Sequence, residues 1–136
     1  MITAIDTSVL LDVFGADDRF GRSSAAAVRQ CLARGSLVAC EVVWAETSAY
    51  FPTVADAQAA FDRLRVDYSP MEMAASLLAG EQWRIYRRAG GTREWVIADF
   101  MIGAHARTHS AQLLTRDRGF YRTYFESLPV VDPSEA

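Results

Sequence analysis

The sequence predicts an α/β fold in which helices cover both faces of a mostly parallel β-sheet. Short apolar runs of β type alternate along the chain with longer runs of helical spacing, which is typical of parallel strands joined by crossover helices. No repeat, low-complexity segment or linker divides the 136 residues, so we expect a single domain over residues 1–136. A chain of this length buries enough surface for a sizeable core.

Four strands are expected, because short apolar runs stand at four places. They occupy residues 2–5, 37–40, 112–115 and 130–131, with the last at an edge of the sheet. The expected helices share apolar residues spaced three or four apart. They cover residues 8–14, 23–34, 41–50, 54–64, 71–89 and 95–109, with a short helical turn at 119–125. Local signals predict where several helices begin and end. Thr7 or Ser8 is the expected cap of the first helix, Gly35 follows the second, and Pro52 stops the third.

Composition excludes several kinds of enzyme in their usual form. All 14 basic residues are Arg, and neither Lys nor Asn occurs. A Walker-type phosphate loop, a Schiff-base enzyme and a dehalogenase-type phosphatase each normally use a Lys. The formal net charge of −3 is at first sight unfavourable for a nucleic-acid partner, which usually meets a basic surface.

The cysteines and the apolar segments predict a cytoplasmic protein. Cys31 and Cys40 lack the spacing of a metal or redox pair, as expected for thiols in a reducing compartment. The first residues lack the basic and apolar regions of a secretory signal. Glu41 and Glu46 interrupt the longest apolar stretch, residues 37–50, so we expect no membrane span.

Four carboxylates stand where parallel sheets bind ligands, outside the carboxyl ends of the strands. Asp6 ends the first expected strand and Asp117 follows the third. Glu46 lies in the helix after the second strand, and Asp99 lies among apolar residues early in the helix 95–109. One such acid is explained as well by a helix cap or an exposed charge. Four together repel one another and require a compensating cation, for which oxygen ligands favour Mg²⁺ or Mn²⁺.

Four motifs that contain these acids follow one another along the chain. They read AIDTSVLL at residues 4–11, VVWAE at 42–46, ADFMIGAHA at 98–106 and LLTRDRGF at 113–120. In this order and spacing they resemble the PIN domain, and more narrowly a VapC-type toxin of a bacterial toxin–antitoxin pair. The resemblance covers nearly the whole chain. It implies a three-layer α/β/α sandwich and a divalent-metal-dependent endoribonuclease, homodimeric and silenced by an antitoxin protein.

The resemblance also assigns roles to particular residues. The family's acidic metal-binding positions correspond to Asp6, Glu46, Asp99 and Asp117. Thr115 falls on a small hydroxyl position, and Thr7 and Ser8 fall on the polar pair after the first acid. These hydroxyls would orient the carboxylates or cap a helix. Gly119 stands where some members carry a further acid, so a second metal would bind weakly or only with substrate.

The expected reaction is hydrolysis of RNA phosphodiester bonds by water that a carboxylate-bound metal activates. The four acids are the expected catalytic and metal-binding residues. Arg22, Arg93 and Arg116 are expected to hold RNA phosphates, with an ion-paired or solvated surface role as the alternative for each. Two other functions stay open. One is a PIN-like RNA-binding scaffold without turnover, and the other is a dehalogenase-type phosphatase, which would need an Asp in place of Ser8 and a Lys.

Further residues invite a functional interpretation but are better explained by structure. His105 and His109 have zinc-binding spacing on one helix, yet residue 106 is Ala and no third ligand is evident, so we expect a structural or exposed role. Asp12 is expected to face solvent. Apolar residues around Phe51 and Phe61 are expected either to pack internally or to cover a dimer or antitoxin surface.

Overall fold

A computed structural model describes residues 1–91 and 95–135 of the chain. The strands among these residues form one sheet, with the order β3-β2-β1-β4-β5 and parallel pairing throughout. They are β1 (Ile2–Ile5), β2 (Ser36–Ala39), β3 (Val66–Tyr68), β4 (Gln112–Leu114) and β5 (Val130–Val131). The mostly parallel sheet that the sequence predicts is confirmed, with β5 at one edge.

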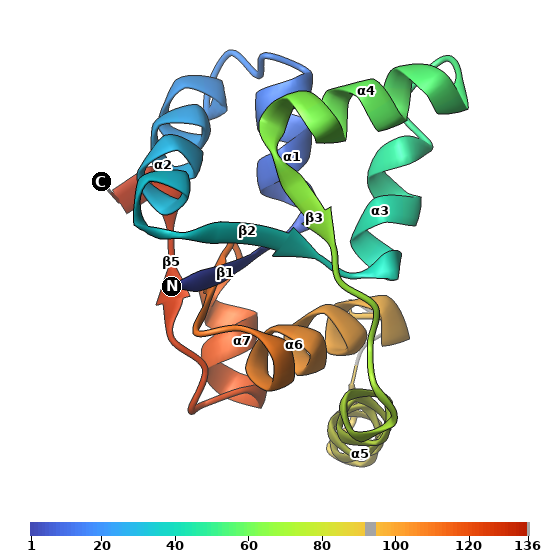
Figure 1. The fold of residues 1–136 in the computed structure, drawn as a ribbon. Coiled ribbons are helices and arrows are strands. Elements are labelled where there is room, and N and C mark those ends of the chain that lie inside the picture. The colour runs from blue at the N-terminus through green and yellow to red at the C-terminus, as the bar shows by residue number, and fades with distance from the viewer. Residues whose placement is uncertain (92–94, 136) are drawn as a thin grey trace.

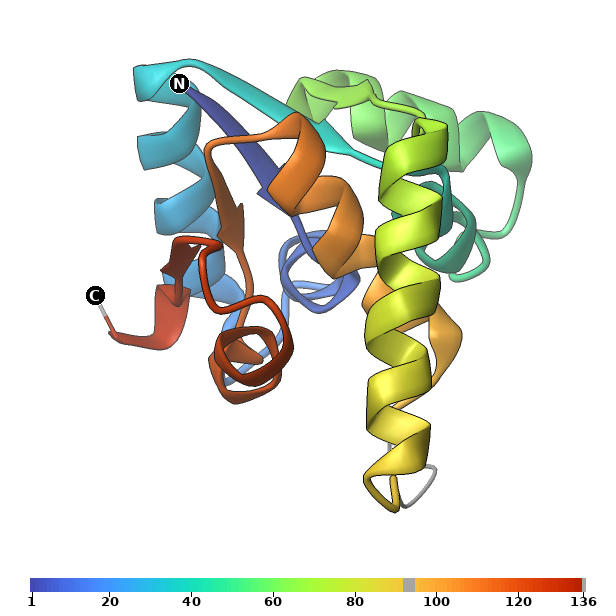
Figure 2. The ribbon, with the colours of Figure 1, turned by 90° about the horizontal axis from the view of Figure 1, so that it is seen from below.

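Helices cover both faces of this sheet, as Figure 1 shows. On one face lie α1 (Thr7–Phe14), α2 (Gly21–Arg34) and α4 (Val54–Leu64). On the other lie α5 (Met73–Arg88), α6 (Ile97–His109) and α7 (Arg118–Tyr124). Beyond the end of β2, α3 (Glu41–Ser48) packs against α1, α4 and α6. Figure 2 shows α5 running alongside α6, and the short helix η1 (Pro133–Glu135) ends the described chain. The three-layer α/β/α sandwich is therefore confirmed.

The strand β3 was not predicted, because its sequence carries almost no apolar signal. Val66 is buried, but Asp67 and Tyr68 are exposed at the edge of the sheet. The strand forms because its backbone pairs with β2, in the register Leu37 to Val66. Backbone pairing of this kind does not depend on side-chain type, and three residues are too few to show the alternation of apolar and polar side chains that predicts a strand.

Several helix starts differ from the prediction by one or two residues. The cap of α1 is Asp6 rather than Thr7 or Ser8, because the Asp6 carboxylate accepts the Thr7 amide. Two residues earlier than predicted, α2 begins at Gly21, after a turn in which the Asp17 carboxylate accepts two backbone amides. Two residues later than predicted, α6 begins at Ile97. By contrast, α4 begins and ends at the predicted residues.

The order of the strands places a switch point between β1 and β4. From β1 the chain moves outward through β2 to β3, and it then returns to the other side of β1 to form β4 and β5. At the carboxyl ends of β1 and β4 the Asp6 amide donates to the Leu114 carbonyl at 3.0 Å. Ligands of open parallel sheets bind at such a point, so the fold selects this edge for inspection.

The buried core packs tightly where α6 meets the end of α7. Gly103 lies in α6, and a Cβ atom added there would collide with the ring of Phe125. Phe125 itself is fully buried, so the ring has little room to move. Within the described residues, no helix combines the length and the apolarity that a membrane crossing requires.

We expect Gly103→Ala to lower the free energy of unfolding by about 1–3 kcal/mol, the usual cost of overpacking a core. Gly80 provides the matched control, because it lies in α5 with open space where its Cβ would be. Gly80→Ala is expected to raise the free energy of unfolding by about 0.5–1 kcal/mol, since Ala favours a helix over Gly. Urea unfolding of the three proteins measures both effects, and a loss of equal size in the two variants would contradict the proposed packing.

Candidate active site

An open hollow of about 430 Å³ lies at the carboxyl ends of β1 and β4. We call it the acidic hollow. Its lining consists of Asp6, Thr7, Ser8, Glu46, Asp99, Ile102, Arg116 and Asp117. All four carboxylates that the sequence singles out therefore border one space, although they come from segments up to 111 residues apart, between positions 6 and 117. The parallel sheet brings them together because each follows or faces a strand end at the same rim.

Asp6 is the most constrained of these acids. One carboxylate oxygen, Oδ1, accepts the Thr7 amide at 2.8 Å. The other, Oδ2, accepts the Thr115 hydroxyl at 2.7 Å and the Tyr121 hydroxyl at 3.4 Å. Burial, and to a lesser extent the charges of Asp117 and Asp99, raise the pKa of Asp6 to about 6 against the lowering effect of its hydrogen bonds from Thr115 and Thr7. Its ionised form is thus held in place but poorly solvated.

Glu46 and Asp99 reach the hollow from two different helices. The Glu46 carboxylate is exposed and accepts the Thr7 hydroxyl at 2.9 Å, which joins α3 to the start of α1. Asp99 accepts the Val96 amide at 2.9 Å and so caps its own helix. Burial raises the pKa of Asp99 above its ordinary value, although this hydrogen bond lowers it.

Two hydroxyl groups of the predicted set have distinct surroundings. Thr115 is fully buried, donates to Asp6 and accepts the amide of Asp117 at 3.0 Å, so it connects the two acids. Ser8 Oγ is buried beside the acidic hollow and has no hydrogen-bond partner among the described residues. A buried hydroxyl without a protein partner is usually satisfied by water or a bound group.

The carboxylates border one hollow but do not form a ready-made ligand shell. Among residues 1–91 and 95–135, no three His, Cys, Asp or Glu side chains are grouped so that they would hold one ion. The donors at the hollow are nevertheless all oxygen atoms, which suit Mg²⁺ or Mn²⁺. Mg²⁺ keeps several of its waters, and such a hydrated ion is compatible with acids spaced around an open hollow.

The prediction that Asp12 faces solvent is wrong. Asp12 is only 4% exposed, and its carboxylate forms a two-pronged ion pair with Arg116, Nε to Oδ2 at 2.7 Å and Nη2 to Oδ1 at 3.0 Å. Ser24 of α2 donates to the same carboxylate at 2.8 Å. The spacing from Asp6 did not reveal this, because the partners lie far away in the sequence.

The three arginines predicted to hold phosphate lie in different situations. Arg116 borders the acidic hollow, but its guanidinium is engaged by Asp12. Arg22 is exposed near the start of α2 and lines another hollow with residues of the α1–α2 region. Arg93 lies outside the described residues.

Tyr121 is a residue of this region that the sequence did not indicate. It is fully buried in α7, and its hydroxyl approaches Asp6. Burial, followed by the nearby charge of Asp6, raises the pKa of Tyr121 well above its ordinary value, so the phenol stays protonated and donates. The only signal in the sequence is its place four residues after Asp117, one helical turn along the same helix.

The two histidines have structural partners, as expected. The ring nitrogen Nε2 of His105 lies 2.9 Å from the Ser69 hydroxyl, and His109 Nε2 accepts the Glu72 amide at 3.2 Å. These contacts fasten α6 to the segment between β3 and α5. His105 is 1% exposed, and burial, with the adjacent His109, lowers its pKa to about 4.

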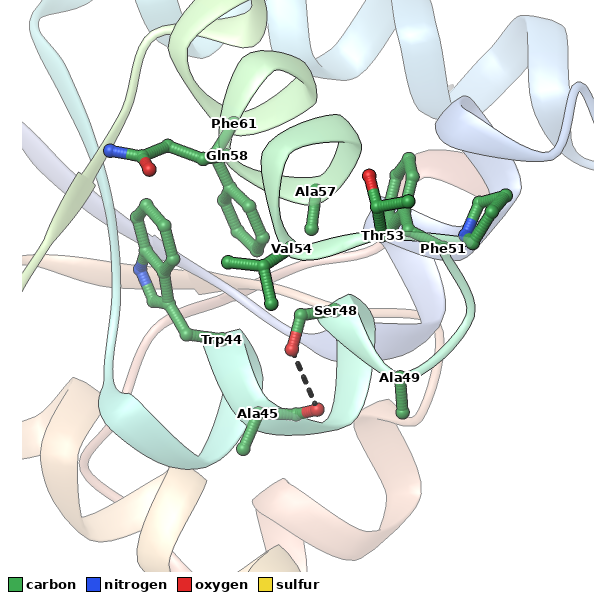
Figure 3. A pocket seen from close by; sticks show the side chains of 11 residues that line it. Trp44, Ala45, Ser48, Ala49, Phe51, Thr53, Val54, Ala57, Gln58 and Phe61 are labelled. Carbon is green, nitrogen blue, oxygen red and sulfur yellow. Dashed lines mark hydrogen bonds between the residues drawn. The ribbon is translucent and has the colours of Figure 1, made fainter.

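A second hollow, of about 550 Å³, lies between α3 and α4 and is lined mainly by apolar side chains (Figure 3). We call it the apolar groove. Trp44 stacks on Phe61 with ring centroids 3.7 Å apart and an interplanar angle of 9°. At its edge Val54 is 85% exposed, and Figure 3 shows this side chain between the two helices. The groove therefore offers apolar surface that this chain leaves open to solvent.

The fold and the site together define an α/β protein with a group of carboxylates at the switch point of a parallel sheet. The chain belongs to the PIN domain family, whose sequence model matches residues 3–126. No curated protein matches it by sequence.

Solved structures share this fold at low sequence identity. A chain of VapBC-1 from nontypeable Haemophilus influenzae has a TM-score of 0.75 and 21% identity, covering 98% of this chain and 99% of that one. A chain of VapBC2 from Rickettsia felis, bound to a DNA fragment from its promoter, has a TM-score of 0.73 and 18% identity, covering 97% of this chain and 98% of that one. The Mycobacterium tuberculosis toxin VapC20, which cleaves the sarcin–ricin loop, has a TM-score of 0.55 and 19% identity, covering 82% of this chain and 86% of that one.

The lowered pKa of His105 predicts how stability depends on pH. Unfolded His105 titrates near 6.5 and the folded residue near 4, so the unfolded chain binds more protons between these values. The contribution of neutral His105 is fully present above pH 6.5 and is lost as the pH falls toward 4, by up to about 3 kcal/mol.

His105→Gln keeps a side-chain amide for Ser69 but does not titrate. On acidification, the free energy of unfolding of the wild type should therefore fall relative to that of the variant. Asp6, whose raised pKa acts with the opposite sign over pH 4 to 6, is present in both proteins and cancels in the difference. Urea unfolding at pH 4.5 and 7.5 measures the effect, and the same difference at both pH values would contradict it.

Proposed function

We propose that this protein is a divalent-metal-dependent endoribonuclease that acts in the cytoplasm as the toxin of a toxin–antitoxin pair. The observation that carries the proposal is the convergence of Asp6, Glu46, Asp99 and Asp117 on one open hollow. Membership of the PIN domain family supports it, as does a shared fold with a toxin that cleaves RNA of the sarcin–ricin loop. A scaffold without turnover would not need to maintain the raised pKa of a buried acid at such a hollow.

The lone pairs of Asp6 indicate how this residue takes part. Its Oδ2 atom already accepts two hydroxyl groups, whereas Oδ1 accepts only the Thr7 amide. An ionised carboxylate has about four acceptor positions, so the remaining one is on Oδ1. We assign Oδ1 as the atom by which Asp6 binds a metal ion, directly or through water.

The other residues of the hollow have complementary roles in the proposal. Asp99 and Asp117 would be further ligands, and a bound metal would supply activated water and neutralise charge on the phosphate oxygens. Exposed Glu46 orients the attacking water and accepts its proton, while the Thr7 hydroxyl fixes its carboxylate. The unpartnered Ser8 hydroxyl would hydrogen-bond a water in the hollow.

The acidic net charge is compatible with an RNA substrate. Four of the 17 acidic residues belong to the proposed site, and the remaining ones are outnumbered by the 14 arginines. Bound divalent ions would add positive charge where the phosphate has to approach. Arg22 and Arg93 would contact the RNA backbone.

We further propose that an antitoxin protein covers the apolar groove and that the toxin is a homodimer. The similar chains from Haemophilus and Rickettsia occur in VapBC complexes, which supports a protein partner. The stacked pair Trp44 and Phe61 with exposed Val54 provides a surface suited to the apolar face of a partner helix.

Asp99→Asn tests the proposed activity directly. Asn retains an oxygen that accepts the Val96 amide, so the helix cap and the fold should persist. Mutating a residue that only supports a metal ligand typically lowers metal affinity or activity ~10–100-fold. Asp99 is proposed as a ligand itself, so we expect cleavage of total RNA in Mg²⁺ or Mn²⁺ to fall ~100-fold or more. Mapping of new RNA ends measures this.

The matched control is Asp62→Asn, an exposed acid of α4 that does not line the hollow. It should cleave like wild type, and chelation of the divalent metal should abolish the discrete ends for both. Full activity of Asp99→Asn would exclude this site. Identical cleavage by all proteins with chelator would indicate a contaminating nuclease.

A charge in the apolar groove should separate toxicity from neutralisation. Val54→Asp places a carboxylate on the groove, and we expect it to weaken antitoxin binding by ~10-fold or more without affecting RNA cleavage. Cells that co-express this variant and the cognate antitoxin should stop growing, whereas cells with wild type should grow. Ala59→Asp adds the same charge to an exposed position of α4 outside the groove and should remain neutralised. Neutralisation of Val54→Asp as well would place the antitoxin elsewhere.

A further inference from the structure

The segment that follows β4 carries groups that serve two different purposes. Thr115 donates to Asp6, and Asp117 borders the same acidic hollow. Arg116 lies between them in the sequence and extends its guanidinium to α1, where it meets Asp12. Thr115 and Asp117 are its immediate neighbours in the chain, so a contact that fixes Arg116 also restrains the backbone from which both extend.

The contact between Arg116 and Asp12 is built as a rigid anchor. Both nitrogens Nε and Nη2 bind the two oxygens of one carboxylate, which is the most directional geometry that an Arg adopts. Ser24 donates to this carboxylate from α2, and the guanidinium lies over the Phe20 ring, 4.1 Å from its centroid. We call Asp12, Arg116, Ser24 and Phe20 together the Asp12 clamp.

The clamp joins three parts of the chain that the sheet does not hold together. Asp12 lies in the last turns of α1, Phe20 and Ser24 lie at the start of α2, and Arg116 lies between β4 and α7. Asp12 is buried and its charge needs a partner, so the guanidinium is strongly bound there. The backbone of Arg116 is thus tied to α1, the helix whose first residue neighbours Asp6.

We propose that Asp12 and Arg116 are positioning residues, which hold the segment 115–117 so that Thr115 and Asp117 face Asp6. The consequence for catalysis rests on the proposed function, whereas the consequence for the segment itself does not. In this assignment Arg116 acts through its neighbours rather than by contact with RNA phosphate. A group that holds a ligand in this way is needed because active sites tolerate displacements of only ~0.5 Å.

The test uses Arg116→Lys, Arg116→Gln, Asp12→Asn and the double variant Asp12→Asn/Arg116→Gln. Lys keeps the positive charge but lacks the planar fork, so it serves a phosphate contact better than it serves the clamp. Each variant is examined by three measurements: hydrogen exchange of the Asp117 amide by NMR, Mn²⁺ affinity by calorimetry, and kcat and KM for RNA cleavage. Circular dichroism checks that each variant folds. If Asp12→Asn does not fold, the test rests on the Arg116 variants, because the Arg116 side chain is partly exposed and its replacement disturbs the core less.

We expect every variant, Arg116→Lys included, to exchange the Asp117 amide ~10-fold faster than wild type, because its partner Thr115 is no longer held. Mn²⁺ should bind ~10-fold more weakly, the usual effect of losing support for a ligand. The change in RNA cleavage should be in kcat, with KM close to wild type. The double variant should be no worse than the single ones, because both remove one contact.

Arg122→Gln in α7 and Asp18→Asn before α2 are the controls. Arg122→Gln removes an exposed positive charge, as Arg116→Gln does, and Asp18→Asn removes an exposed negative charge, as the control for Asp12→Asn. Both should match wild type in all measurements. The assignment is overturned if Arg116→Lys keeps wild-type exchange and Mn²⁺ affinity, or if Arg116 variants raise only KM while Asp12→Asn is normal. If the wild type shows no metal-dependent cleavage, the proposed nuclease function fails, and the amide exchange still decides whether the clamp positions the segment.

Discussion

The hydrogen bond from Thr115 to Asp6 joins the carboxyl ends of β1 and β4, and the arrangement of the candidate site depends on it. It is short and buried, and it lies just beyond the ends of these two neighbouring strands, where the order of the sheet reverses. Because the acceptor is an ionisable carboxylate, the same bond orients a site group and partly offsets its loss of hydration. Glu46 and Asp99 border the hollow from α3 and α6, and Asp117 borders it from the position just before α7.

The site opposes the stability of the fold. Burial and neighbouring carboxylates raise the pKa of Asp6 to about 6, so keeping it ionised at neutral pH lowers the free energy of unfolding. Asp12, an acid of α1, is instead satisfied within the protein, because Arg116 neutralises its charge and Ser24 donates a hydrogen bond to it. One acid is therefore satisfied within the protein, while the other retains an acceptor position toward an open hollow. Such an unsatisfied arrangement is typical of functional sites rather than of structural ion pairs.

Two different surfaces on the same molecule are suited to different partners. The acidic hollow is polar and open, whereas the apolar groove between α3 and α4 presents Trp44, Phe61 and exposed Val54. The two meet at α3, since Glu46 borders the hollow and Trp44 lines the groove two residues earlier. A partner seated in the groove would therefore contact the helix that carries one of the site carboxylates.

The sequence by itself determined most of the elements, though not β3, and it determined the four candidate acids. Helical spacing gave α4 its observed bounds, and the position of Asp6 directly after an apolar run placed it at the rim of a parallel sheet. Only the tertiary structure decided that Asp12 is buried, that Arg116 binds it, and that Tyr121 reaches Asp6. Those contacts join residues more than 100 positions apart, between 12 and 116 and between 6 and 121. Local patterns of apolar and polar residues record which face of a helix is buried, but not which distant side chain meets it there.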